Sequence, residues 1–350
     1  MTRLCLNTLT AWITVAAVRH PRRLGAALAE RFAVTAPTAR RALRRLVALQ
    51  WLVNEGTARA PRYAPGCLRQ VVQRYALQGL TEDLPWRRDF APFFALPGSV
   101  QQMAEHTFYE LVNNAIDHSG GTAVAVSMRQ TASHVQLLVS DDGVGLFGRI
   151  AQAFAIEEPP LAMLELSKGK LTSQPHAHTG HGLFFASRLA DVFELHANDA
   201  SFQHRSWDAR GWQAQRALKH RGTSAYASFL LDTDRTVESV RQVYSLDGSG
   251  AAFDRTRVGL QLLTSDTVGL QSRAQARRVS ARCSDFRQVE LDFAGVPEVS
   301  HAFADELFRV LSHKETGVRW VALNMSPTVA RLIDGVSARH ASDVLAGRTP

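Results

Sequence analysis

Four short motifs occur in a fixed order across the middle of the chain, and they limit its fold more than any other feature does. Three of them contain closely spaced glycines or a glycine at a strand start, and the first lies on a predicted helix. In chain order they are Glu110 with Asn114, Asp141–Gly145, Gly180–Leu183 and Gly222-Thr223. Each motif alone is typical of an ordinary turn or a solvated helix. All four together, in this order, form a stronger signal than any one of them alone.

The residue types in these motifs suit a nucleotide with a bound metal ion. Mg²⁺ prefers oxygen ligands, and the carboxamide of Asn114 offers one without adding negative charge beside a triphosphate. Glycines allow the backbone to approach a ligand closely, and those concerned are Gly143, Gly145, Gly180 and Gly182. A predicted helix begins near Gly182, and phosphate is favoured at a helix N-terminus.

The four motifs resemble those of the GHKL ATPase superfamily, which includes the ATP-binding domains of gyrase, Hsp90, MutL and histidine kinases. The resemblance covers about residues 95–232 and implies an α/β sandwich of the Bergerat type that binds Mg-ATP. It implies that Asp141 accepts a hydrogen bond from adenine with support from Thr223, and that Asn114 binds Mg²⁺. Glu110 takes the position of the general base that polarises water, so slow hydrolysis is expected in a gyrase-like member. Leu183 completes the second glycine motif.

The stretch between the two glycine motifs, about residues 156–181, corresponds to the ATP lid of the superfamily. It holds Lys168 and Lys170, two of the four lysines in the chain. Either lysine is a candidate for a phosphate contact, and a solvated loop lysine is the alternative. Residues 76–100 contain no histidine but include Pro85, Pro92 and Pro97. They leave no room for a phosphoacceptor hairpin, which disfavours a conventional sensor histidine kinase.

Positive charge is concentrated at the N-terminus. The net charge is +8, yet residues 1–75 hold 13 arginines against only two acidic residues, Glu30 and Glu55. Such asymmetry favours a module that binds a polyanion. Apolar spacing predicts one helix over Leu24–Phe32 and a second over Ala36–Gln50, followed by a hairpin that ends near Tyr63.

The second of these helices carries its arginines on the face opposite its apolar stripe. They are Arg40, Arg41, Arg44 and Arg45. The segment resembles the winged helix-turn-helix domains of bacterial repressors, which implies that these arginines contact DNA. A helical hairpin with a solvated basic face is the alternative.

The C-terminal third alternates strand and helix patterns, which predicts an α/β layer with parallel strands. The run over 289–311 resembles the STAS-like family. STAS domains are partners of GHKL anti-sigma kinases and carry a phosphorylatable serine at a corresponding corner. Ser300 is the candidate acceptor here, and an ordinary N-cap of the following helix is the alternative.

The sequence therefore predicts a multidomain α+β protein. The expected parts are a winged helix-turn-helix domain over 1–75, a GHKL ATP-binding domain over 76–235 and a STAS-like domain over 236–350. The preferred hypothesis is a DNA-binding regulator that is switched by Mg-ATP and acts as a homodimer. One alternative is an anti-sigma-type serine kinase acting on a STAS-like partner in cis or trans, and another is a slow ATPase that its basic domain tethers to DNA.

Three dispersed cysteines argue against a disulfide framework or a structural zinc site. No apolar run approaches the ~20 residues of a membrane span. We therefore expect a cytoplasmic protein whose partners are ATP, DNA and a protein that binds the C-terminal domain.

Overall fold

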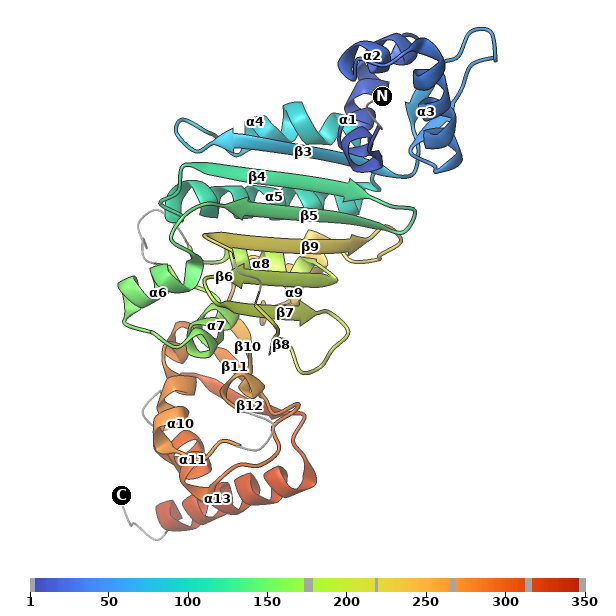
Figure 1. Cartoon of the computed structure of the whole chain (residues 1–350). Helices are drawn as coiled ribbons and strands as arrows, with labels where there is room; N and C mark the ends of the chain where they lie inside the picture. The colour runs from blue at the N-terminus through green and yellow to red at the C-terminus, as the bar shows by residue number, and fades with distance from the viewer. Residues whose placement is uncertain (1–3, 173–178, 218–219, 265–268, 312–316, 346–350) are drawn as a thin grey trace. The chain divides into compact units, whose positions relative to one another are not determined.

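The computed structural model describes residues 4–172, 179–217, 220–264, 269–311 and 317–345 (Figure 1). The chain divides into two compact units. Unit 1 comprises Met1–Gly143 and Gly222–Asp234, and unit 2 comprises Val144–Arg221 and Arg235–Pro350. The elements of both units confirm the expected multidomain α+β organisation. Among the described residues, no helix combines the length and apolar character that crossing a bilayer requires.

Unit 1 begins with three helices and a two-stranded antiparallel hairpin. They are α1 (Leu6–Arg19), α2 (Leu24–Arg31), α3 (Ala36–Ala48), β1 (Leu52–Asn54) and β2 (Tyr63–Pro65). Helix α3 starts where the sequence provides a start signal, since the Oγ1 of Thr35 accepts a hydrogen bond from the backbone N–H of Thr38 at 3.5 Å. Pro37 lies in the first turn, where its missing N–H costs nothing.

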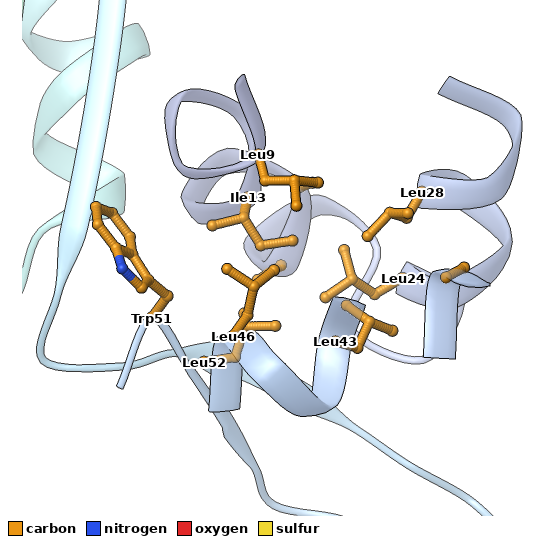
Figure 2. Packing of buried hydrophobic residues seen from close by; sticks show 11 residues of the cluster. Leu9, Ile13, Leu24, Leu28, Leu43, Leu46, Trp51 and Leu52 are labelled. Atoms are coloured by element: carbon orange, nitrogen blue, oxygen red, sulfur yellow. The ribbon is translucent and has the colours of Figure 1, made fainter. Parts of the chain in front are cut away.

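The three N-terminal helices share one apolar core (Figure 2). Its side chains point toward one another from α1, α2, α3 and β1, and none of those labelled in Figure 2 is more than 7% exposed: Leu9, Ile13, Leu24, Leu28, Leu43, Leu46, Trp51 and Leu52. Leu24 and Leu28 of α2, and Leu43 and Leu46 of α3, belong to the apolar stripes that the helical spacing predicts. The arginines of α3 occupy the other face, and all four are exposed: Arg40, Arg41, Arg44 and Arg45.

The rest of unit 1 is an antiparallel sheet with a helix packed on it. Its strands, in spatial order, are β3 (Arg69–Ala76), β4 (Ala123–Gln130), β5 (His134–Asp141) and β9 (Thr223–Leu230). The long helix α5 (Gly98–His118) packs on β5 and β9. Short helical turns connect β3 to α5, namely α4 (Asp83–Pro85), a π turn (Trp86–Phe90) and a 3-10 turn (Ala91–Phe93). Strand β3 spans the domain boundary expected at residue 75.

The described residues of unit 2 that precede its C-terminal layer form four helices and three antiparallel strands. The helices are α6 (Leu146–Phe154), α7 (Pro159–Lys168), α8 (Gly182–Leu189) and α9 (Val237–Val243). The strands, in order, are β6 (Val192–Ala197), β7 (Ala200–Arg205) and β8 (Trp212–Ala214). Strands β7 and β8 lie in the region 197–221, for which the sequence predicts no element.

The C-terminal layer of unit 2 has the parallel strands that the sequence predicts. They are β10 (Arg255–Gly259), β11 (Gln288–Asp292) and β12 (Arg319–Leu323). The helices are α10 (Arg273–Ser280), α11 (His301–Asp305), which continues as a π turn (Glu306–Leu311), and α13 (Pro327–Leu345). The sequence predicts the first strand over 258–263, but β10 begins three residues earlier and ends at Gly259, because Leu260–Leu263 form a 3-10 turn. Every residue of the central strand β11 is buried, as is usual for a parallel strand that is covered on both faces.

Candidate functional site

Helix α5 carries the first motif on its half-buried side. Glu110 and Asn114 lie one turn apart there, while Phe108 and Leu111 are buried beneath the helix. The Nε2 of His106 lies 4.0 Å from the Oε1 of Glu110. Helix α5 therefore sets the orientation of both Glu110 and Asn114, because its apolar face packs against the sheet.

Asp141 ends strand β5 with only 7% of its surface exposed. Its Oδ1 accepts hydrogen bonds from the backbone N–H of Gly143 at 2.9 Å and of Thr223 at 3.2 Å. Gly222 has φ +90°, and a Cβ there would lie 2.2 Å from the carbonyl oxygen of Asp141. Unit 1 thus brings the Asp141 motif and the Gly222-Thr223 motif together, although about 80 residues separate them.

The end of α5 packs against the same loop. A Cβ on Gly143 would lie 2.2 Å from the carbonyl oxygen of Ser119, so only glycine fits this approach. The hydroxyl of Ser119 donates to the carbonyl of Ala115 at 2.6 Å and accepts from the N–H of Gly121 at 3.0 Å. The helix that carries Asn114 and the loop that follows Asp141 are therefore held in contact.

Asp142 is a site residue that the sequence analysis did not identify. Its Oδ1 accepts from the backbone N–H of Thr122 at 2.7 Å and of Ala123 at 2.9 Å, and its Oδ2 accepts from the hydroxyl of Thr122 at 2.8 Å. The hydrogen bonds from Ala123 and Thr122 lower the pKa of this carboxyl to about 2. Asp142 therefore holds the start of β4 beside the end of β5. In the sequence, the only signal for this role is that two aspartates, Asp141 and Asp142, are adjacent.

In unit 2, the end of the first glycine motif is held by Asn198 in the β6–β7 turn. The Nδ2 of Asn198 donates to the carbonyl of Val144 at 3.0 Å, and its Oδ1 accepts from the N–H of Gly148 at 3.2 Å. Gly145 has φ +85°, and a Cβ there would lie 2.4 Å from the Oδ1 of Asn198. The sequence offered only an Asn-Asp turn as a signal for this contact.

The second glycine motif forms the start of α8. Gly180 has φ +69°, and a Cβ there would lie 2.6 Å from the carbonyl carbon of Lys170. His181 is the N-cap residue of α8 but makes no side-chain cap, and Gly182 and Leu183 form the first turn, where both are half-buried. Backbone N–H groups at such a helix end suit an anion. Residues 173–178 of the expected lid lie outside the described residues.

The two lysines between the glycine motifs both bind other parts of unit 2, and the alternative of a fully solvated loop lysine is wrong for Lys168. Lys168 is fully buried at the end of α7. Its ammonium donates to the Oε1 of Glu165 at 2.6 Å and to the carbonyls of Arg278 at 3.1 Å and Ala281 at 2.7 Å. These three acceptors use all three donors of the ammonium, so none is left for a phosphate.

Lys170 is half-buried. It donates to the carbonyl of Asp285 at 2.7 Å and lies 4.3 Å from the centre of the Phe286 ring. Burial lowers its pKa. This lysine also contacts other parts of unit 2 instead of extending into solvent.

Ser300 acts as the N-cap of α11. Its Oγ accepts from the backbone N–H of Phe303 at 3.1 Å and donates to the carbonyl of Gln271 at 2.7 Å. The cap that the sequence analysis held as the alternative is present. Its role as a phosphate acceptor stays a prediction.

Two family models match the chain. Residues 99–230 match the histidine kinase-, DNA gyrase B- and HSP90-like ATPase family, and residues 275–330 match a STAS-like domain of unknown function. No curated protein matches the chain. The first match supports ATP binding, and its bounds include all four sequence motifs. The chain therefore carries a GHKL ATPase domain followed by a STAS-like domain.

Proposed function

We propose that this chain is a DNA-binding regulator in which Mg-ATP, bound by the GHKL domain, switches a winged helix-turn-helix over about residues 1–75. The observation that carries DNA binding is the division of α3 into two faces. One face supplies core leucines that are at most 1% exposed, and the other exposes four arginines. A helix with a buried apolar stripe and a free basic face suits the DNA major groove.

Further basic residues flank α3 in the same part of unit 1. Arg22 and Arg23 are exposed just before α2, and Arg59 and Arg62 are exposed in the connection between β1 and β2. Only Glu30 and Glu55 oppose them up to residue 75. Arginine contacts to phosphates supply affinity for any sequence, and contacts of α3 to base edges supply specificity.

In the GHKL domain, we assign Asp141 and Thr223 to adenine and Asn114 to Mg²⁺. Two backbone amides hold the Asp141 carboxylate in one orientation, and Gly222, which has no Cβ, allows the backbone before Thr223 to approach Asp141 closely. The backbone at Gly180, Gly182 and Leu183 is assigned to the phosphates, a role supported by the uncapped start of α8. ATP supplies the negative charge that such a helix end favours.

Glu110 is assigned the role of general base for slow hydrolysis. Its carboxylate is half-buried and lies near His106 on a rigid helix, so it has a fixed direction. Replacing it with alanine spares ATP binding and removes turnover. We propose a homodimer as the working form, because two copies of α3 then meet two half-sites.

Fluorescence anisotropy with labelled duplex DNA tests the proposal, with and without Mg-ATP. We expect the nucleotide to change DNA affinity several-fold in the wild type and to have no effect in Asn114→Ala, which loses metal-dependent ATP binding. Calorimetry measures ATP binding separately. Titrations that overlay with and without ATP, although calorimetry shows that ATP binds, overturn the switch.

A further inference from the structure

The most unusual charged group in unit 2 is the buried ammonium of Lys168. A lysine that loses all contact with water is stable only when every donor finds a partner. Here one partner is the carboxylate of Glu165, one turn earlier in α7, and the other two are main-chain carbonyls more than 100 residues away. Movement of α7 away from these carbonyls would leave a buried charge without two of its partners.

The distant partners belong to the STAS-like match. The carbonyls of Arg278 and Ala281 lie at the C-terminal end of α10, where the last turn of a helix has unpaired carbonyls and partial negative charge. The ammonium of Lys168 therefore caps α10 from outside. We call Lys168, Glu165 and these two carbonyls the lysine clamp.

Thr256 in β10 and Arg282, which follows α10, also bind the end of α7. The buried hydroxyl of Thr256 in β10 donates to the carbonyl of Lys168 at 2.7 Å. Arg282 donates to the Oε2 of Glu165 and to the carbonyl of Gly169, both at 3.3 Å. The end of α7 is thus attached to both β10 and α10.

Residues next to the lysine clamp contact the second glycine motif. Gly180 packs against the backbone of Lys170, whose ammonium is bonded to the carbonyl of Asp285. The ring of His181 lies 4.9 Å from that of Phe253, edge to face, and Phe253 lies 5.3 Å from Phe286. Gly180 therefore contacts Lys170 and its neighbour His181 contacts Phe253, and both Lys170 and Phe253 contact Phe286.

We propose that the lysine clamp makes the STAS-like domain a regulator of the ATP site in cis. The domain holds α7, Gly169 and Lys170 in place, and Lys170 lies against Gly180, so that this part of the site is already positioned when nucleotide arrives. Binding of nucleotide then stabilises the end of α10 in return, because coupling between two sites is reciprocal. A protein or small molecule that moves α10 changes ATP affinity through the same contact. This inference rests on the ATP binding proposed above.

Hydrogen exchange on the full chain tests the coupling. With saturating Mg-ATP, we expect amides of residues 278–286 to exchange several-fold more slowly than without it. Lys168→Met keeps the length and apolar stem of the side chain but removes its charge. It should lose the ATP-dependent protection of 278–286 and bind Mg-ATP about fivefold or more weakly. Arg287→Met is the matched control, since Arg287 is exposed in the same domain, and it should behave as the wild type.

The outcomes separate the two proposals. If calorimetry shows no ATP binding to the wild type, the proposed function fails and the coupling fails with it. If ATP binds while exchange over 278–286 stays unchanged, the coupling alone is overturned. If Lys168→Met does not fold, the exchange measurement on the wild type still decides whether the coupling exists. A folded Lys168→Met variant that keeps both the wild-type ATP affinity and the ATP-dependent protection of residues 278–286 also overturns the coupling.

Discussion

Neutralising the arginines of α3 should remove most of the salt-dependent DNA affinity. The change is a quadruple variant in which glutamine replaces Arg40, Arg41, Arg44 and Arg45. All four side chains are exposed and the apolar stripe of α3 is untouched, so we expect the free energy of unfolding to change by roughly 0.5 kcal/mol or less per site. Loss of DNA binding then reports on the charges and not on the fold.

The size of the effect follows from the number of arginines. Each phosphate contact contributes about −0.9 to the slope of log affinity against log salt concentration, so four contacts contribute about −3.6 per copy. Between about 50 and 200 mM salt, that slope corresponds to a loss of affinity of about 150-fold. For each bound copy, the variant should show a slope flatter by about 3.6, and each single substitution should flatten it by about 0.9.

Anisotropy titrations over a series of salt concentrations measure the slope. The control replaces four exposed arginines outside the N-terminal helices with glutamine, which makes the same change in net charge: Arg129, Arg205, Arg216 and Arg287. It should keep the wild-type slope. Equal flattening in both variants would mean that DNA responds to overall charge, and an unchanged slope in the α3 variant would refute its role as the recognition helix.

Gly222→Ala should destabilise unit 1 by about 2 kcal/mol or more, because it adds strain at φ +90° to a clash with the Asp141 carbonyl. Gly211→Ala, at φ +73° with open space around it, should cost less in the same urea titration. The pKa of Asp142 is lowered from 3.8 to about 2, so the stability it contributes is complete above about pH 4 and is lost as the pH falls toward 2. Asp142→Asn should weaken that acid dependence in urea unfolding, and an unchanged dependence would refute it. Ser300→Ala should cost about 1 kcal/mol through the lost N-cap; label from γ-labelled ATP that depends on Ser300 would instead favour the serine kinase.

Local sequence rules predict most of unit 1 because its patterns are regular. The sequence predicts strands over 122–129, where apolar and polar residues alternate, and over 135–140, and β4 and β5 begin and end within one residue of these bounds. The pair Gly120-Gly121 predicts the end of α5. Strand β7 escapes prediction because two of its buried residues are polar. His204 is 6% exposed and contacts Arg188 from α8, and Ser201, three residues earlier, is also buried. A polar residue whose partner lies on another element hides the alternation that would reveal the strand.

In the site, as in the fold, the local sequence predicts some residue roles, and others depend on contacts with distant segments. Glycines that allow close backbone approach are visible in the sequence, and Gly143 and Gly222 lie where such approaches occur. Asp142 and Asn198 act through hydrogen bonds to backbone groups of other segments, which only the folded chain brings near. The error over Lys168 has the same origin, because a lysine beside a glycine is typical of a loop until carbonyls from α10 surround it.

The way the N-terminal helices join the sheet constrains how a switch can work. The backbone N–H of Gln70, in strand β3, donates to the Oγ1 of Thr14 in α1 at 3.0 Å. Strand β3 is itself paired with β4 along its whole length. The basic helices are therefore attached to the ATPase sheet through a strand and not through a flexible linker. We therefore expect the N-terminal helices of each copy to stay fixed to that copy's sheet. ATP would alter DNA affinity by changing how two copies associate, and hence the spacing between their α3 helices.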